Sequence, residues 1–216
     1  MEKYTLRQCT LTQLDRLFGL RNTLTSDVLT QWLQQPNELT EVEKTLIGLL
    51  QTLLIENAEG WNEQELALHF IGPMFSLVHF TERYRFNLFA ERRIGAIVPG
   101  VHNDIELYGE PDGLIATGYR EPEIPLFAFS EYKRQLDPTG DPAGQVLAAM
   151  LVGQALDPRP KPLYGCYVVG YDWRFMVLQG KEYTISKDYS ALRDDVFDIF
   201  CILKTLKQII LTLTAT

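Results

Sequence analysis

The chain has 216 residues, of which 20 are Lys or Arg and 28 are Asp or Glu, so its formal net charge is −8. Hydrophobic residues make up 46 % and charged residues 22 %, proportions typical of a globular protein, which exclude disordered, collagen-like and mucin-like chains. The acidic balance argues against a protein that coats DNA through a basic surface, but not against one with a local basic strip. The length predicts a single domain over residues 1–216.

The cysteines and the apolar segments indicate the compartment. Cys9, Cys166 and Cys201 are odd in number and far apart, so neither a disulfide framework nor a CxxC metal motif is expected. The N-terminus has no apolar run after a basic start, and no apolar stretch reaches about 18 residues. We therefore expect a soluble, cytoplasmic protein with no membrane partner.

Helical spacing dominates the first part of the chain. Leucines recur at that spacing between residues 10 and 56, so residues 1–58 are expected to form an N-terminal helical extension. The remaining residues, 60–216, are expected to form the core. A helix should begin at Glu63, and Pro73 should kink or end it.

From about residue 84 the apolar pattern takes the period of strands, and short connections suggest an antiparallel meander. The expected strands are 86–90, 94–98, 105–108, 113–116 and 125–133. Residues 145–156 are apolar almost all round, which predicts a helix buried against a sheet. Further strands and a long apolar C-terminal helix follow. The pattern predicts an α/β (α+β) domain, with a central mixed sheet and an antiparallel meander flanked by helices.

Two polar fragments interrupt the apolar strands. Asp112 lies at the bend of Gly109–Gly113, and Glu131 and Lys133 end an apolar strand, where alternation places both side chains on one face. Two carboxylates and a backbone carbonyl suit a hard divalent cation such as Mg²⁺. A lysine beside such an ion can orient a water molecule for phosphodiester hydrolysis.

These fragments, Glu110-Pro111-Asp112-Gly113 and Glu131-Tyr132-Lys133, lie 19 positions apart from Asp112 to Glu131. They resemble the PD-(D/E)xK nuclease superfamily, which has the restriction endonuclease-like fold. The segment NEQELALHFIGPMF resembles the first helix of many members, and GQVLAAMLVGQAL resembles the helix after their lysine strand. The likeness covers roughly residues 60–180.

The resemblance implies a metal site. Asp112 and Glu131 would ligate Mg²⁺, with Mn²⁺ as an alternative, and the carbonyl of Tyr132 would complete the set. Glu63 would bind the metal through water or hold a second ion, with Glu65 as the fallback acid.

The resemblance also implies the chemistry. Lys133 would position the attacking water, and Gln145 would contact the substrate or orient Lys133. The implied function is a Mg²⁺-dependent endonuclease or exonuclease that hydrolyses phosphodiester bonds of nucleic acid, with DNA expected ahead of RNA.

Basic residues surround the first expected strand, where phosphate contact and a solvated strand face are both open interpretations. They are Arg83, Arg85, Arg92 and Arg93, and Arg134 could join them.

Each candidate has a structural alternative. Asp112 could form a turn, Glu131 and Lys133 a solvated pair, and Glu63 a favourable first-turn charge. The alternative function is a catalytically inactive nuclease-fold protein that acts as a binding or assembly module. A homodimer is also expected, through the leucine-rich N-terminal helices or the C-terminal helix. The Tyr and Phe residues are expected mostly in the core.

Overall fold

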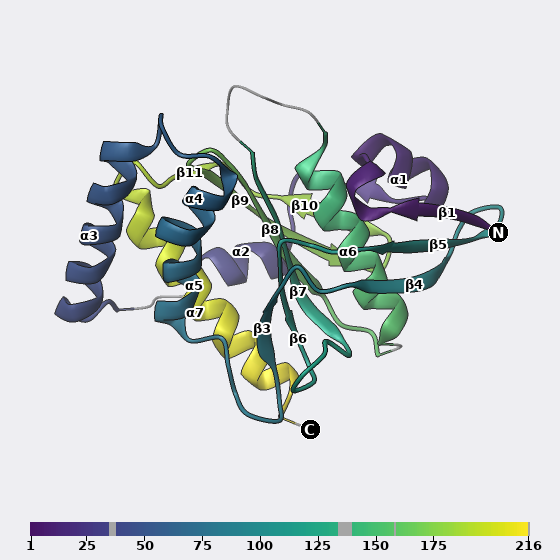
Figure 1. The fold of residues 1–216 in the computed structure, drawn as a ribbon. Coiled ribbons are helices and arrows are strands. Elements are labelled where there is room, and N and C mark those ends of the chain that lie inside the picture. Colours follow the sequence, from purple (N-terminus) through teal and green to yellow (C-terminus); the bar gives the residue numbers. More distant parts are fainter. Residues whose placement is uncertain (35–37, 134–139, 158, 216) are drawn as a thin grey trace.

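The computed structural model describes residues 1–34, 38–133, 140–157 and 159–215, with the backbone alone for residues 129–133. The described chain is a mixed α/β structure in which helices cover both faces of a central sheet (Figure 1). The strands are β1 Glu2–Thr5, β2 Arg21–Asn22, β3 Asn87–Ala90, β4 Ile94–Pro99, β5 Asp104–Gly109, β6 Gly113–Ala116, β7 Pro125–Lys133, β8 Leu163–Val169, β9 Asp172–Gln179, β10 Glu182–Ile185 and β11 Tyr189–Ser190. The helices are α1 Leu11–Phe18, α2 Asp27–Gln34, α3 Glu41–Asn57, α4 Glu63–Leu66, α5 Gly72–Val78, α6 Pro142–Leu156 and α7 Asp195–Leu213, with a 3₁₀ turn η1 Leu6–Gln8 and a π-helical segment η2 Ala67–Ile71.

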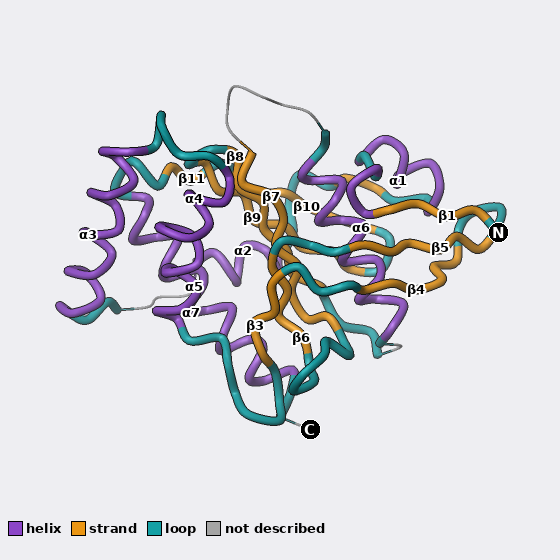
Figure 2. The backbone as a smooth tube through the Cα atoms, in the orientation of Figure 1, coloured by secondary structure: helices purple, strands orange, loops and turns teal. Residues whose placement is uncertain are grey.

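The main sheet has the order β2-β10-β9-β8-β7-β6-β3, and β11 pairs with β9. Strand β7 runs antiparallel to β6 and parallel to β8. Parallel neighbours need a crossover connection, and α6 provides it, as Figure 2 shows beside the central strands. The prediction of a mixed α/β domain with a central mixed sheet flanked by helices is therefore confirmed.

The strands of the meander are not all consecutive in the chain. Strand β3 pairs with β6 and not with its neighbour β4. Strands β4 and β5 instead form a hairpin, and β1 joins β5 in parallel to complete a separate three-stranded sheet. A strand pattern in the sequence does not specify its partner, which is why chain order was misleading here.

The N-terminal residues contribute strands as well as the expected helices. Strand β1 pairs with β5, and β2 pairs with β10 at the edge of the main sheet. Helix α1 packs on α6, while α2 and α3 pack on α7. Residues 1–58 thus contact both sheets and both helical layers.

The helix from Glu63 passes Pro73 without ending. The N–H group of Gly72 bonds to the carbonyl of Ala67, so one wide π turn precedes α5. Pro73 is the second residue of α5, directly after this π turn. A Cβ at Gly72 would lie 2.9 Å from the Ala67 oxygen, so the turn favours glycine.

Strand alternation divides the core into two clusters on opposite faces of the main sheet. On β9, Phe175 belongs to the cluster under α2, α5 and α7, whereas Met176 belongs to the cluster under α6. Residues Ala143–Gly153 of α6 are all buried, which confirms the prediction of a helix buried against a sheet. None of the described helices is long and apolar enough to cross a membrane.

Candidate functional site

The ends of four strands, β6, β7, β8 and β9, lie together at the upper edge of the main sheet in Figure 1. Because β6 is antiparallel to β7 and β8 is parallel to it, the start of β6 lies beside the ends of β7 and β8. Strand β9 starts at the same edge because it is antiparallel to β8. Helix α6 is the next described element after β7 and begins at this edge, so its positive N-terminal end belongs to it.

Asp112 and Glu131 follow from the last pair of the β6–β7 ladder. Gly113 lies opposite Phe129, so half-buried Asp112 is one residue beyond this pair on its strand and Glu131 is two residues beyond it. The backbone N–H of Glu91 donates to the carbonyl of Asp112 at 3.4 Å, which ties the end of β3 to the same point. The backbone thus brings the two predicted metal ligands to neighbouring positions.

A bulge occurs at Glu131. Ser130 lies opposite Tyr167 and Tyr132 lies opposite Val168, so β7 advances two residues while β8 advances one. Glu131 is the extra residue, so the regular pairing of β7 with β8 is interrupted there. The prediction that Glu131 and Lys133 share one face concerns side chains outside those described. Bulges are common next to active sites, because they turn a side chain away from the regular direction.

The end of β7 continues the candidate set. Lys133 lies opposite Val169 of β8, which in turn lies opposite Asp172 at the start of β9. The side chains of Glu131, Tyr132 and Lys133 are not among those described, and Arg134 lies outside the described residues altogether.

Gln145 lies in the first turn of α6. Asp141 caps this helix: its carboxylate accepts the N–H of Gly144 at 2.9 Å and, from the N-terminal segment, that of Leu11 at 2.8 Å. Gln145 is only 7 % exposed, and its Nε2 has no hydrogen-bond partner among the described residues. A buried amide donor without a partner costs about 1–3 kcal/mol, so this side chain needs a reason other than stability.

Two acids compete for the role at the start of α4. Glu65 closes a capping box, in which the N–H of Asn62 donates to Glu65 Oε2 at 2.7 Å and the N–H of Glu65 donates to Asn62 Oδ1 at 2.9 Å. Glu63 is exposed at the first position of α4, which contacts β7. Glu63 is therefore the acid of the two whose carboxylate takes no part in the capping box.

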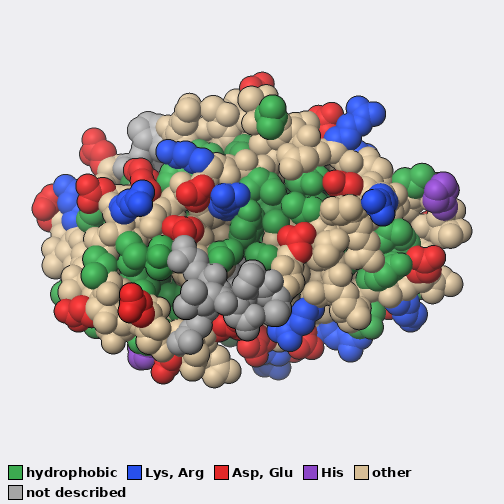
Figure 3. Space-filling model, turned by 90° about the horizontal axis from the view of Figure 1, so that it is seen from above, with side chains coloured by type: hydrophobic (Ala, Val, Ile, Leu, Met, Phe, Trp, Pro, Cys, Tyr) green, Lys and Arg blue, Asp and Glu red, His purple; other side chains and the backbone are tan. Residues whose placement is uncertain are grey.

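The predicted basic strip is divided between the two ends of β3. Ala90 lies opposite Gly113, so Arg92 and Arg93 follow β3 on the side of Asp112. Asn87 lies opposite Ala116, so the other two arginines precede β3 at the far end of the ladder. Figure 3 shows basic and acidic side chains interspersed over the described part of the upper face.

The four arginines of the predicted strip whose side chains are described also differ in their contacts. Arg85 donates from Nη2 to the carbonyl of Leu211 at 2.7 Å and to Thr214 Oγ1 at 3.2 Å, which holds the end of α7. Arg92 forms an exposed ion pair with Glu121 at 3.3 Å. The remaining pair make cation–π contacts, Arg93 with Tyr108 and Arg83 with Tyr84.

One further group lies beside the site and was not predicted. Tyr167 of β8 is opposite Ser130 on one side and Arg174 on the other. Burial raises the pKa of the Tyr167 hydroxyl, and the Arg174 guanidinium partly offsets this. A tyrosine inside an apolar strand has the sequence signature of a core residue, so no signal distinguished it.

The donors fit a hard divalent cation. Two carboxylates and the Tyr132 carbonyl are oxygen ligands, as Mg²⁺ and Mn²⁺ prefer. Among the residues whose side chains are described, no three His, Cys, Asp or Glu lie together as a metal site, and Glu131 is not in that set.

Comparison of the chain with known proteins finds no matching family model and no matching curated protein. Function is therefore inferred from the arrangement of its own residues.

Proposed function

We propose that this protein is a metal-dependent nuclease of the PD-(D/E)xK type that hydrolyses phosphodiester bonds, with DNA preferred to RNA. The observation that carries the proposal is the neighbouring position of Asp112 and the bulged Glu131 at the end of the β6–β7 ladder. The order of elements agrees with it: a helix, a meander, a buried crossover helix and a parallel strand surround the edge where they meet.

Each residue has a role in this proposal. Asp112, Glu131 and the Tyr132 carbonyl hold Mg²⁺ or Mn²⁺, and Glu63 approaches from α4. A bound ion of this kind polarises the phosphoryl group and lowers the pKa of a water molecule. Lys133 orients the attacking water and stabilises developing negative charge.

The buried amide of Gln145 supports the same assignment. Its unpartnered Nε2 donor lies at the positive end of α6, where a phosphate oxygen or an oriented water would satisfy it. Arg92 and Arg93 are the arginines on the side of Asp112, so they are the phosphate contacts we propose. Arg134 remains a predicted contact.

The test is cleavage of plasmid DNA, single-stranded DNA and RNA with Mg²⁺ or Mn²⁺, together with calorimetric titration of each metal. Asp112→Asn and Lys133→Met should lower cleavage by at least about a hundredfold, because a metal ligand and a charge-stabilising group are lost. Asp104→Asn, at an exposed carboxylate of β5, is the matched control and should cleave normally. A protein that binds neither metal and cleaves none of the substrates would instead be the inactive binding or assembly module.

We also propose that the protein forms a homodimer through α3. Four residues on its outer side form a stripe with spacings of four, three and four, the a/d pattern of a coiled coil. They are Val42, Leu46, Leu49 and Leu53, which are 68 %, 37 %, 59 % and 44 % exposed. The apolar stripe of α7, by contrast, is buried within the fold.

A second copy fits this stripe better than an unrelated partner. In an antiparallel pair about a twofold axis, Val42 of one copy would face Leu53 of the other, and Leu46 would face Leu49. The four residues of the stripe are uncharged, and Thr45 flanks it, so the centre of the pair would bring apolar side chains together. A groove of about 690 Å³ between α3 and α5 adjoins the stripe and adds apolar contact area.

A further inference from the structure

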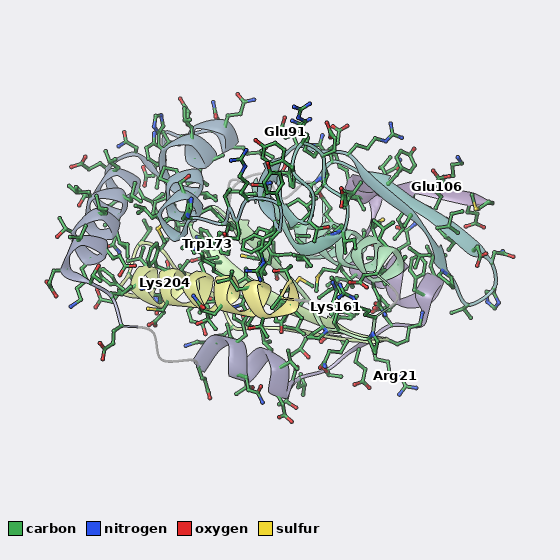
Figure 4. All side chains as sticks on the ribbon, turned by 90° about the horizontal axis from the view of Figure 1, so that it is seen from below. Arg21, Glu91, Glu106, Lys161, Trp173 and Lys204 are labelled. Atoms are coloured by element: carbon green, nitrogen blue, oxygen red, sulfur yellow. The ribbon has the colours of Figure 1, made fainter. Side chains whose placement is uncertain are left out.

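Two exposed tyrosines stand together at the end of the sheet opposite the candidate metal site. Tyr84 is 71 % exposed and Tyr119 is 52 % exposed, and their ring centroids are 5.5 Å apart. Tyr84 comes from the turn before β3 and Tyr119 from the connection between β6 and β7. Both connections reach the lower end of the molecule in Figure 1, and the view from below in Figure 4 looks onto this end.

The turn that carries Tyr84 is held in a strained conformation. Glu82 and Phe86 exchange backbone hydrogen bonds of 2.9 and 3.1 Å, which closes the turn. Tyr84 lies between them with φ at 66°, a region that bulky side chains rarely adopt. Such strain persists only where the surroundings enforce it, and it is concentrated at functional sites.

The connection that carries Tyr119 is also fixed. The N–H of Thr117 donates to the carbonyl of Ile124 at 3.0 Å, and Asn87 Nδ2 donates to the carbonyl of Gly118 at 3.0 Å. Gly118 has φ at 102°, and a Cβ there would collide with the Glu121 carbonyl oxygen, so only glycine fits. The backbone that carries each ring is thus fixed before any ligand arrives, which lowers the entropic cost of binding.

A cation completes the patch. The guanidinium of Arg83 lies 4.9 Å from the ring centroid of Tyr84 and 6.0 Å from that of Tyr119. No carboxylate of the described residues is within ion-pair distance of it. A hollow of about 430 Å³ adjoins both rings, and Arg159, which is paired with Asp157, and Glu123 are among its lining residues.

We propose that Tyr84, Tyr119 and Arg83 bind single-stranded nucleic acid, whose bases stack on the two rings and whose phosphates contact the guanidinium. Exposed planar rings beside an unpaired cation select a ligand that has both planar rings and negative charge. Base–aromatic stacking tolerates any sequence, and single strands expose the base faces that a duplex hides. The patch rests on its own contacts and does not require the upper edge to be catalytic.

Fluorescence anisotropy tests the patch with a labelled oligodeoxythymidine of about 12 nucleotides, in EDTA so that no metal-dependent cleavage occurs. Tyr84→Ala, Tyr119→Ala and Arg83→Ala should each bind about tenfold more weakly, because each removes a stacking or phosphate contact. Tyr84→Phe keeps the ring and should bind within about twofold of wild type. Tyr4→Ala, on β1 in the smaller sheet, is the control and should bind as wild type does.

Other results would overturn the proposal. Equal affinity for a duplex of the same length would mean that charge alone binds, and equally tight binding of thymidine monophosphate would indicate a nucleotide pocket. Wild-type affinity in both alanine variants of the tyrosines would exclude stacking. A loss of binding in Tyr84→Phe equal to that in Tyr84→Ala would also contradict the proposal. Thermal melts identify any variant that fails to fold. Cleavage with Mg²⁺ is measured separately, so the patch and the proposed nuclease can fail independently.

Discussion

Asp112 and Ser130 are the first residues beyond the last pair of the β6–β7 ladder, in which Gly113 lies opposite Phe129. The next residue of β7 is Glu131, which the bulge sets apart from the regular pairing with β8. Two acids are therefore placed together by the backbone of adjacent strands and not by a flexible loop. Such placement gives a metal site a rigid frame, which is what a fixed coordination geometry requires.

Gln145 offers a way to separate function from stability. We expect Gln145→Met to keep or raise stability by about 1 kcal/mol, because it removes a buried unpartnered donor from the core side of α6. The same change should lower nuclease activity by about ten- to a hundredfold, because the proposed contact with substrate or water is lost. Urea denaturation and cleavage assays on the same preparation measure both effects.

Gln154 provides the control, because it lies on the same helix and its Oε1 is also buried with no partner in the part of the chain that the structure describes. Gln154→Met should change stability to a similar extent and leave cleavage unchanged. If Gln145→Met is destabilising and fully active, the residue is structural and has no part in the site.

The extent to which the fold follows from sequence depends on the length of each element. Strand β7 and helix α6 were predicted because their apolar runs are long and uninterrupted. Strands β1 and β2 were not predicted, since four and two residues carry no readable period. Their pairing with β5 and β10 is non-local, so no short-range pattern signals it.

The candidate site divides in the same way. The nearness of Asp112 and Glu131 follows from strand ends that the sequence marks with polar residues, and the structure places these strands side by side. The bulge at Glu131 could not be read from the sequence, because the only proline of β7 is Pro125 at its start and no glycine or proline lies near Glu131. Tyr84 and Tyr119 were expected in the core with the other aromatic residues, since composition does not distinguish a ring that is held outward by a turn.

The ion pairs of Asp157 should make the stability of the folded protein depend on pH. Its buried carboxylate is bound by Arg159 at 2.9 Å and by Lys161 at 2.5 Å, and these cations, Arg159 foremost, hold its pKa well below the ordinary value of 3.8. A carboxyl whose pKa is lowered by folding stabilises the protein above the unfolded pKa, and that stabilisation is lost as the pH falls below it. Urea denaturation of the wild type should therefore give a smaller free energy of unfolding at about pH 3 than at about pH 6. The difference between the two pH values should be smaller in Asp157→Asn.

The substitution should also act at neutral pH. Asp157→Asn leaves Lys161, whose side chain is 8 % exposed, without its counter-charge, at a cost of about 3 kcal/mol. Asp188→Asn removes one partner of an exposed ion pair with Arg174 and should cost less than about 1 kcal/mol. Equal effects of the two variants would contradict a special role for the buried pair.

Gly144 joins the start of α6 to the N-terminal segment. A Cβ at this position would lie 2.6 Å from the Cys9 carbonyl oxygen and 2.7 Å from Thr10 Cα, and backbone atoms cannot yield as a side chain can. Gly144→Ala should therefore destabilise the protein by about 1–3 kcal/mol and disturb the adjacent Gln145. Gly48→Ala is the control, since nothing lies within 4 Å of its Cβ and alanine favours a helix. Wild-type stability in Gly144→Ala would show that the two segments can separate without cost.

The proposed dimer interface on the exposed stripe of α3 can be tested by introducing a charged residue. Leu49→Lys places a cation at the centre of the proposed antiparallel pair, where the other copy would bury it against Leu46, so the protein should become monomeric. Ile55→Lys is the matched control, because Ile55 is 56 % exposed on the same helix but lies off the stripe, against 59 % for Leu49. Light scattering coupled to size-exclusion chromatography should give a dimer for wild type and Ile55→Lys and a monomer for Leu49→Lys. A monomeric wild type at high protein concentration would rule out the pair, and a dimer that persists in Leu49→Lys would place the interface elsewhere.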